Sequence, residues 1–185
     1  MCINKCVEKK LISHNPTNGI RLSQFDEVTK EILTLKEIQK LAVTSCPNNE
    51  VKRAFLFSCY CGLRWCDVYQ LRYKDVDFPA RRLTIIQQKV QTHSKSAILH
   101  LNLNHTALKL LQKCNGDRED LVFSLPSYSY TIRILRKWVI DANIRKHITF
   151  HCARHSFITN IMANGANIKT AASLAGHSTT RHTEK

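Results

Sequence analysis

The motif H-x-x-R-H-S at residues 151–156 has the side chains to hold an anionic oxygen. His151 and Arg154 are three positions apart near the predicted start of a helix. That spacing puts an imidazole and a guanidinium on one helix face, and the free N–H groups of the helix start add positive potential. A phosphate is the natural ligand of such a site. The alternative is a His and an Arg exposed on a basic helix.

A second arginine follows a predicted helix end. In the motif G-L-R-x-x-D, Gly62 precedes Arg64 by two positions and Asp67 follows Arg64 by three. A carboxylate three residues away can hold a guanidinium in a fixed orientation, so Arg64 is a second candidate anion ligand with Asp67 as its support. The alternative is a surface ion pair.

Two lysines and one further histidine are candidate donors to the same anion. Lys89 lies where a predicted strand enters a polar hairpin tip, and Lys95 lies at the other end of that tip. Either ammonium could protonate a leaving oxygen, and the residues alone do not choose between them. His177 directly follows Gly176, which could free its ring to point across a cleft. The alternative for all three is an exposed charge on a turn.

Charge and composition favour nucleic acid as the partner. The 185 residues include 28 Lys and Arg against 14 Asp and Glu, a net charge of +14 and a pI near 9.6. Such a surplus favours a polyanion, nucleic acid before an anionic membrane. With 43% hydrophobic and 23% charged residues the chain is typical of globular proteins, which excludes disordered, collagen-like and coiled-coil classes. We find no signal peptide and no apolar run of about 18 residues, and therefore expect a cytoplasmic protein.

The eight cysteines are expected to be reduced thiols of the core, because they are spread over apolar helical patterns without a secretory signal. The alternative is a zinc site at Cys59, Cys61 and Cys66. Their spacing, C-x-C-x4-C, lacks the second paired cluster of structural zinc sites, so no metal and no cofactor are predicted.

The periodicity predicts one mostly helical α+β domain from about residue 31 onward. Thr34 and Glu37 form a capping box that starts its first helix, and Gly62 suits the left-handed end of the next. Two strands, 83–86 and 97–101, follow a short extended segment at 76–78 and form a small antiparallel sheet. Four more helical patterns complete the domain, at 106–113, 129–142, 151–164 and 168–175. Residues 1–30 are irregular and polar apart from a short helix ending near Ile12, and stand apart as a linker.

The order G-L-R-x-x-D, a hairpin lysine, H-x-x-R-H-S and G-H-S resembles the catalytic domain of the tyrosine recombinases, the phage integrase family. It is most similar to integrases of bacterial mobile elements. The likeness covers residues 31–185 and implies the mostly helical fold with a small antiparallel sheet that the pattern predicts. It also implies double-stranded DNA as the partner, and a tetramer assembled on DNA by the full-length protein.

The resemblance assigns a role to each candidate. Arg64 and Arg154 clamp the scissile phosphate, and His151 and His177 complete the pocket. Lys89 is the general acid for the 5′-hydroxyl leaving group, and Asp67 supports Arg64. In this chemistry a tyrosine hydroxyl attacks the phosphate and forms a 3′-phosphotyrosyl link, without a metal ion or nucleotide cofactor.

The nucleophile is the one part that the sequence does not supply. In the family the tyrosine typically comes nine positions after the motif histidine, which places it directly after Lys185. All five tyrosines precede the H-x-x-R motif: Tyr60, Tyr69, Tyr73, Tyr128 and Tyr130. We therefore expect residues 31–185 to be a catalytic domain truncated just before its nucleophile, and residues 1–30 to be a linker with the remnant of an absent amino-terminal DNA-clamping (core-binding) domain. The alternatives are a DNA-binding module that has lost its chemistry, and a basic RNA-binding or zinc-stabilised protein.

Overall fold

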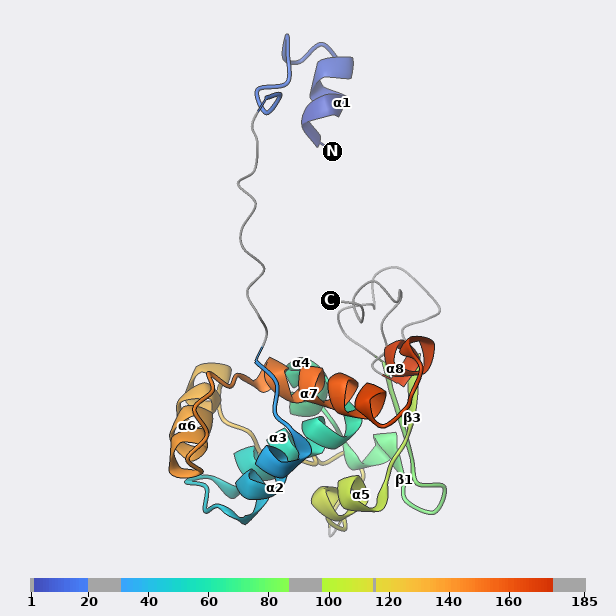
Figure 1. Cartoon of the computed structure of the whole chain (residues 1–185). Coiled ribbons are helices and arrows are strands. Elements are labelled where there is room, and N and C mark those ends of the chain that lie inside the picture. Colours follow the sequence, from blue (N-terminus) through green and yellow to red (C-terminus); the bar gives the residue numbers. More distant parts are fainter. Residues whose placement is uncertain (1, 20–30, 87–97, 115, 175–185) are drawn as a thin grey trace.

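The computed structural model describes residues 2–19, 31–86, 98–114 and 116–174. Helices surround a central helix, and a small sheet lies at one side (Figure 1). In chain order the elements are α1 (Cys2–Glu8), α2 (Leu35–Val43), α3 (Asn49–Cys61), α4 (Trp65–Tyr69), the 3₁₀ turn η1 (Tyr73–Asp75), β1 (Val76–Asp77), β2 (Arg82–Ile86), β3 (Ile98–Asn102), α5 (His105–Leu111), α6 (Tyr128–Asp141), α7 (Phe150–Ala163) and α8 (Ile168–Leu174). The predicted α+β class is confirmed. No helix of the described ranges is long and apolar enough to cross a membrane.

The central helix α3 begins and ends where its local sequence requires. The Asn48 side chain accepts a hydrogen bond from the N–H of Val51 at 3.0 Å, which satisfies a free donor of the first turn. Gly62 ends the helix with φ +71°, a conformation that glycine adopts at little cost. A side chain at Gly62 is also excluded by packing, because a Cβ there would lie 2.4 Å from Cδ1 of Phe157 on α7. The turn that carries the first arginine motif therefore sits directly against the helix that carries the second.

The core is built around α3, which contacts α2, α5, α6 and α7. Phe55 of α3 is fully buried and meets two aromatic rings edge to face, Trp138 of α6 at 6.0 Å and Phe150 of α7 at 5.6 Å between centroids. Such edge-to-face pairs add to the free energy gained by burying the rings. The packing fixes the start of α7, on which the H-x-x-R motif lies, against α3.

The sheet has the order β1-β2-β3 with both pairs antiparallel. Leu83 lies opposite Leu101 and Ile85 opposite Leu99, and these four side chains are buried while their neighbours face outward. This alternation is the period of two that a strand with one buried face requires. The predicted antiparallel sheet is confirmed, with the 76–77 segment as its third strand.

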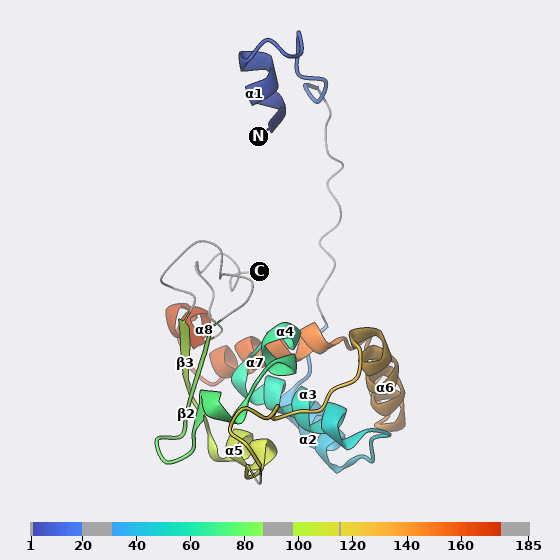
Figure 2. The same ribbon diagram turned by 180° about the vertical axis from the view of Figure 1, so that it is seen from behind.

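Predicted helix bounds agree with the structure to within one or two residues, with two exceptions. The sequence predicts a first helix that ends near Ile12, but α1 ends at Glu8, and Lys10 adopts a left-handed φ of 55°. Leu11, which follows, is 71% exposed, so no packing against a core extends the helix. In Figures 1 and 2, α1 stands apart from the helices of residues 31–174. The second exception is α4, a five-residue helix that the periodicity does not predict.

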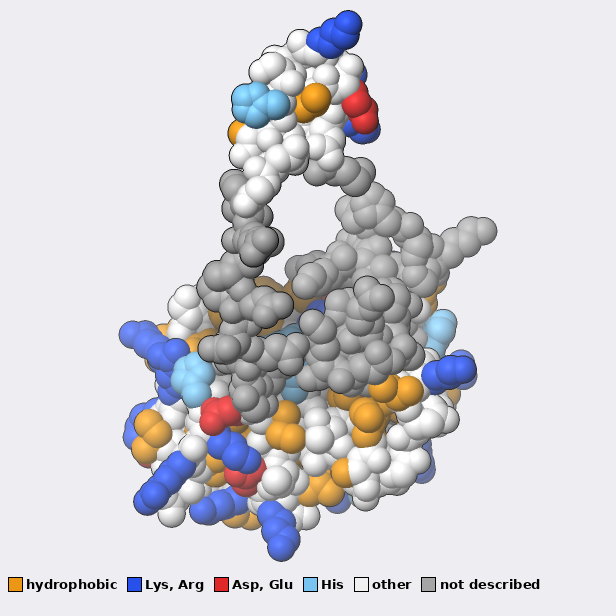
Figure 3. Space-filling view, turned by 45° about the horizontal axis from the view of Figure 1, so that its top comes forward, with side chains coloured by type: hydrophobic (Ala, Val, Ile, Leu, Met, Phe, Trp, Pro, Cys, Tyr) orange, Lys and Arg blue, Asp and Glu red, His pale blue; other side chains and the backbone are white. Residues whose placement is uncertain are grey.

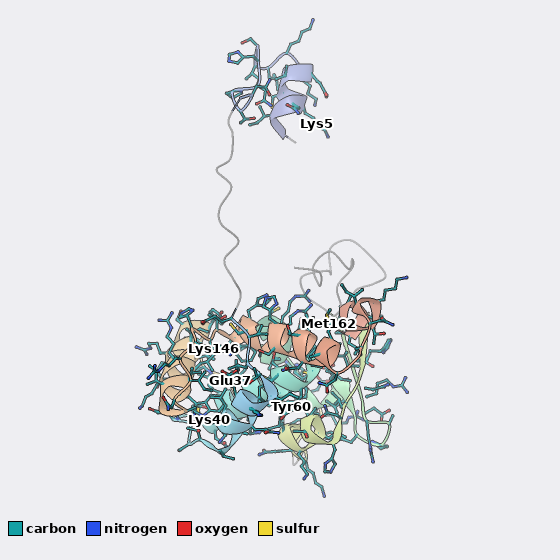
Figure 4. The ribbon with its side chains drawn as sticks, viewed as in Figure 1. Lys5, Glu37, Lys40, Tyr60, Lys146 and Met162 are labelled. Carbon is teal, nitrogen blue, oxygen red and sulfur yellow. The ribbon has the colours of Figure 1, made fainter. Side chains whose placement is uncertain are left out.

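Residues 31–34 lead into the domain, and hydrogen bonds hold this entry segment against α2 and the residues around α7. The predicted capping box is present: the Thr34 N–H donates to Glu37 Oε2 at 2.7 Å, and the Glu37 N–H donates to Thr34 Oγ1 at 3.3 Å. Lys146, before α7, donates to the same Glu37 carboxylate at 2.7 Å, and Figure 4 shows the two side chains in the same part of the domain. Burial acts to raise the pKa of Glu37, but the hydrogen bonds from Lys146 and Thr34 outweigh it and leave that pKa lowered.

The last residue of the H-x-x-R-H-S motif makes a further bond to this entry segment. Ser156 Oγ accepts a hydrogen bond from the N–H of Leu33 and donates one to the carbonyl of Cys152, both at 2.7 Å. Asn160, one turn later, donates to the carbonyl of Leu33 at 3.1 Å. Leu33 and Ser156 are both fully buried.

Ser156→Ala is therefore expected to lower the free energy of unfolding by about 1–3 kcal/mol, because it leaves the Leu33 N–H buried without an acceptor. Urea unfolding followed by circular dichroism measures the change. Ser173→Ala, at an exposed position of α8, is the matched control and should change stability by less than about 0.5 kcal/mol. Equal stabilities of the Ser156 variant and the native chain would contradict the assignment.

Candidate active site

Arg154 is a charged side chain that is almost completely buried. It lies on α7 with 1% of its surface exposed. Its Nη1 donates a hydrogen bond of 2.7 Å to the carbonyl of Gly62, across 92 residues of sequence. Within the described part of the chain its Nη2 has no hydrogen-bond partner. A buried guanidinium with an unsatisfied amino group is the donor that an anionic oxygen would satisfy.

The two arginines lie close enough to repel each other. Burial lowers the pKa of Arg154 to about 10, repulsion from Arg64 contributes to that lowering, and Asp67 acts in the opposite direction. Arg64 Nη1 lies 4.0 Å from Asp67 Oδ2, and the Asp67 side chain is 1% exposed against 18% for Arg64. The predicted pairing of Arg64 with Asp67 is thus present as a partly buried ion pair rather than a surface one. Two guanidiniums beside one carboxylate leave a net positive site.

His151 lies on the same helix, one turn before Arg154, and its side chain is exposed. Its ring meets that of His155 edge to face, with 4.5 Å between centroids. Because α7 begins at Phe150, His151 belongs to the first turn, where free backbone N–H groups add positive potential. The structure thus places Arg64, Asp67, His151 and Arg154 on the adjoining ends of α3, α4 and α7, which Figures 1 and 2 show side by side.

Three predicted site residues lie outside the described residues. Lys89 and its rival Lys95 fall between β2 and β3 in the sequence, and His177 follows α8. Their roles, and the choice between the two lysines, therefore stay predictions.

The cysteines near the site are free thiols. Cys59 and Cys61 are buried on α3, and burial raises the pKa of Cys61 to about 12. Burial also raises the pKa of Cys66, which is only partly buried. Among the described residues no three His, Cys, Asp or Glu side chains are grouped so that they could hold a metal ion together, which argues against the zinc alternative for Cys59, Cys61 and Cys66. Of the seven cysteines whose side chains the structure describes, none is in a disulfide, three are buried in the core (Cys59, Cys61 and Cys152) and Cys46 packs against the core while partly buried.

Sequence reasoning missed two contributions to this site. The carbonyl of Gly62, rather than a side chain, accepts the bond that holds Arg154. Trp65, which directly follows Arg64, packs its ring 5.0 Å from that of Phe150, the residue before His151. The position of Trp65 inside the G-L-R-x-x-D motif was the available signal, but its contact with Phe150 depends on the tertiary fold.

Comparison with known proteins gives one family. The model described as "Phage integrase family" matches residues 31–185. A tyrosine recombinase of Pseudothermotoga lettingae is 31% identical over 170 residues, which cover 89% of this chain and 58% of that protein. The tyrosine recombinase XerC of Oceanobacillus iheyensis is 26% identical over 187 residues, covering 94% of this chain and 61% of that protein. The chain thus spans about three-fifths of the length of these relatives.

Solved structures share the fold. The integrase of the Tn1549 transposon, in complex with transposon right-end DNA, superposes with a TM-score of 0.76 at 20% identity, over 97% of this chain and 69% of that one. The XerA recombinase superposes with a TM-score of 0.67, also at 20% identity, over 83% of this chain and 58% of that one. The expected fold is therefore confirmed for the described residues between 31 and 174.

Proposed function

The chain belongs to the phage integrase family, and from that premise we propose that residues 31–185 form a catalytic domain that cuts and rejoins double-stranded DNA. Arg64 and Arg154 hold the scissile phosphate, with His151 and His177 as further donors. Lys89 protonates the departing 5′-oxygen. A tyrosine hydroxyl attacks the phosphorus, which gives a 3′-phosphotyrosyl bond and a free 5′-hydroxyl, and the reverse attack by a 5′-hydroxyl of another strand rejoins the DNA.

The observation that carries this proposal is the state of Arg154. Its guanidinium is 1% exposed, has one amino group unsatisfied within the described residues and is repelled by Arg64. Each of these features raises the free energy of the folded protein when no ligand is bound. An anion between Arg64 and Arg154 removes that cost, because it accepts a bond from the unsatisfied amino group and offsets the repulsion. A phosphodiester supplies two nonbridging oxygens, which suits two guanidinium groups.

The same arrangement supports the reaction as well as binding. Negative charge on the nonbridging oxygens must be neutralised in the transition state of phosphoryl transfer, and donors fixed in advance do this without reorganisation. The Gly62 carbonyl and the buried Asp67 carboxylate fix the two guanidiniums. Asp67 and the Gly62 carbonyl are positioning groups in this scheme, whereas Arg64 and Arg154 touch the phosphate.

Exchange of strands sets the number of subunits. Two duplexes contribute two strands each, so four phosphates are cut and four nucleophiles are needed. We therefore propose that the longer protein acts as a tetramer on DNA. A protein with this substrate works in the compartment that holds the DNA, which in bacteria is the cytoplasm.

The basic surface predicts how binding depends on salt. In the view of Figure 3, Lys and Arg side chains stand out around the margin of the molecule with few acidic side chains between them. A chain of net charge +14 that neutralises about six phosphates should bind duplex DNA with a log–log salt slope near about −5. Fluorescence anisotropy with a labelled duplex between 50 and 200 mM salt (about a thousandfold fall in affinity) measures it. Affinity that does not change with salt would refute DNA binding by this surface.

A further inference from the structure

A group of aromatic rings lies beside the phosphate site, two of them exposed and the third, Trp65, partly buried. Trp65 and Tyr69 of α4 and Tyr128 at the start of α6 form this aromatic cluster, with the Trp65 ring 5.4 Å from that of Tyr69 and 5.3 Å from that of Tyr128. Tyr69 is 41% and Tyr128 45% exposed. The core fixes the position of the cluster, because Trp65 also packs against Phe150, which is fully buried.

The cluster is continuous with the proposed active site. Trp65 directly follows Arg64, and Phe150, its partner in the core, directly precedes His151. A nucleotide whose phosphate lies between Arg64 and Arg154 therefore has its sugar and base within reach of these rings.

We propose that the aromatic cluster stacks on an unpaired DNA base next to the phosphate held by Arg64 and Arg154. This inference rests on the proposed function. Bases of an intact duplex are stacked on one another, so only a nucleotide that has left the helix can offer its face to a protein ring. Strand exchange requires such nucleotides, because base pairs beside the cut must open before a strand can pair with a new partner. An aromatic ring can stack on any of the four bases, which suits a site whose binding must not depend on the DNA sequence.

The exposed rings of Tyr69 and Tyr128 and the neighbouring Arg64 favour a nucleic acid over a protein segment as the occupant. A protein segment would need apolar or acidic side chains to meet this surface, whereas a nucleotide brings a flat apolar base and a phosphate in one unit. Arg64, which directly precedes Trp65, complements that phosphate charge. A protein occupant is therefore left as an outcome of the test.

Tryptophan fluorescence reports on the cluster directly. The chain has two tryptophans; Trp65 is in the cluster and Trp138 is fully buried in the core. The 185-residue chain is titrated with a single-stranded oligonucleotide of mixed sequence and with an abasic oligonucleotide of the same length and charge. We expect the oligonucleotide with bases to quench the emission and to bind about tenfold more tightly, as stacking of one base would give. Equal affinities without quenching would overturn the inference.

Variants separate the cluster from exposed aromatic residues in general. Tyr128→Leu and Tyr69→Leu should each lower affinity for the oligonucleotide with bases about 5- to 10-fold and leave the abasic oligonucleotide unaffected. Tyr128→Phe, which keeps the ring, should bind as the native chain does. Tyr130→Leu is the matched control: Tyr130 is 47% exposed on the same helix turn, but two positions from Tyr128 and so on another face. An equal loss in Tyr130→Leu would count against the inference.

Two further outcomes have a defined meaning. Failure of the native chain to bind either oligonucleotide or duplex DNA would overturn the proposed function, and the inference with it. Normal binding of duplex and abasic DNA with no contribution from bases would overturn the inference alone. If sedimentation shows that the Leu variants at Tyr69 and Tyr128 change self-association while their DNA affinities are unchanged, the occupant is a protein and the proposal is wrong.

Discussion

In a longer form of the protein that carries the nucleophilic tyrosine, Arg154→Met is expected to cleave DNA at least ~100-fold more slowly than the native sequence. Methionine fills a similar volume but cannot donate to the phosphate. Loss of one transition-state donor costs that much or more where the donor is fixed in advance and shielded from water. Single-turnover cleavage under saturating protein measures the chemical step separately from binding, which should change much less.

The same substitution is expected to leave the free energy of unfolding unchanged or to raise it. A pKa lowered from 12.5 to about 10 means that the folded state disfavours the charged form of Arg154. A shift of that size corresponds to roughly 3 kcal/mol, present at every pH below about 10 and relieved only as the pH rises toward the unfolded value. Against this, the Arg154→Met variant would forfeit one hydrogen bond to the Gly62 carbonyl, worth about 1 kcal/mol.

Arg53 provides the matched control. It is also buried, with 8% of its surface exposed, but it donates to the carbonyls of Leu110 and Leu111 and pairs with Glu50. Arg53→Met should therefore destabilise the fold by about 2 kcal/mol or more, while the folded fraction cleaves at the native rate. If Arg154→Met proved as unstable as Arg53→Met, or still cleaved DNA at the native rate, Arg154 would be a structural residue.

The contrast between these two arginines is one that the sequence alone does not reveal. Both lie on predicted helices, and neither spacing tells which guanidinium is satisfied by carbonyl groups. The partners of Arg53 are the last carbonyls of α5, more than fifty residues away, and the partner of Arg154 is the end of α3. Local patterns do not encode contacts over such distances, so the H-x-x-R spacing and the resemblance identified Arg154 as a candidate phosphate ligand without predicting its burial or its bond to the Gly62 carbonyl.

What the sequence does predict is local. The Gly62 end of α3, the Thr34–Glu37 capping box and the strand patterns of β2 and β3 each depend on residues a few positions apart. The five-residue α4 lacks such signals: Arg64 precedes it without a side-chain capping bond. It forms in the fold, where Trp65 packs against Phe150 and Asp67 and Val68 are buried. Ser156, quoted only as part of a motif, likewise acquires its structural role through Leu33.

The nucleophile leads to an all-or-none prediction. Residues 1–185 should bind DNA without forming a covalent link to it, whereas the chain with a tyrosine-initiated extension joined after Lys185 should form one. The five tyrosines at 60, 69, 73, 128 and 130 all precede α7, and Tyr60 and Tyr73 are partly buried against the core. Water is a poor substitute for the hydroxyl, because alignment of a nucleophile contributes about 7 kcal/mol or more to such a reaction.

Nicked duplexes with a randomised central region make the test independent of the target sequence, because a nick lets the cut fragment diffuse away and traps the covalent product. A denaturing gel should show a protein–DNA band for the extension that begins with tyrosine and none for the same extension beginning with phenylalanine.

Combining the tyrosine extension with Arg64→Met should remove the band while retaining salt-dependent binding, since the phosphate would lose a donor in the transition state. A covalent band from residues 1–185 alone would show that one of the five internal tyrosines attacks, and would overturn the placement of the nucleophile after Lys185. Bands of equal strength from the tyrosine and phenylalanine extensions would do the same.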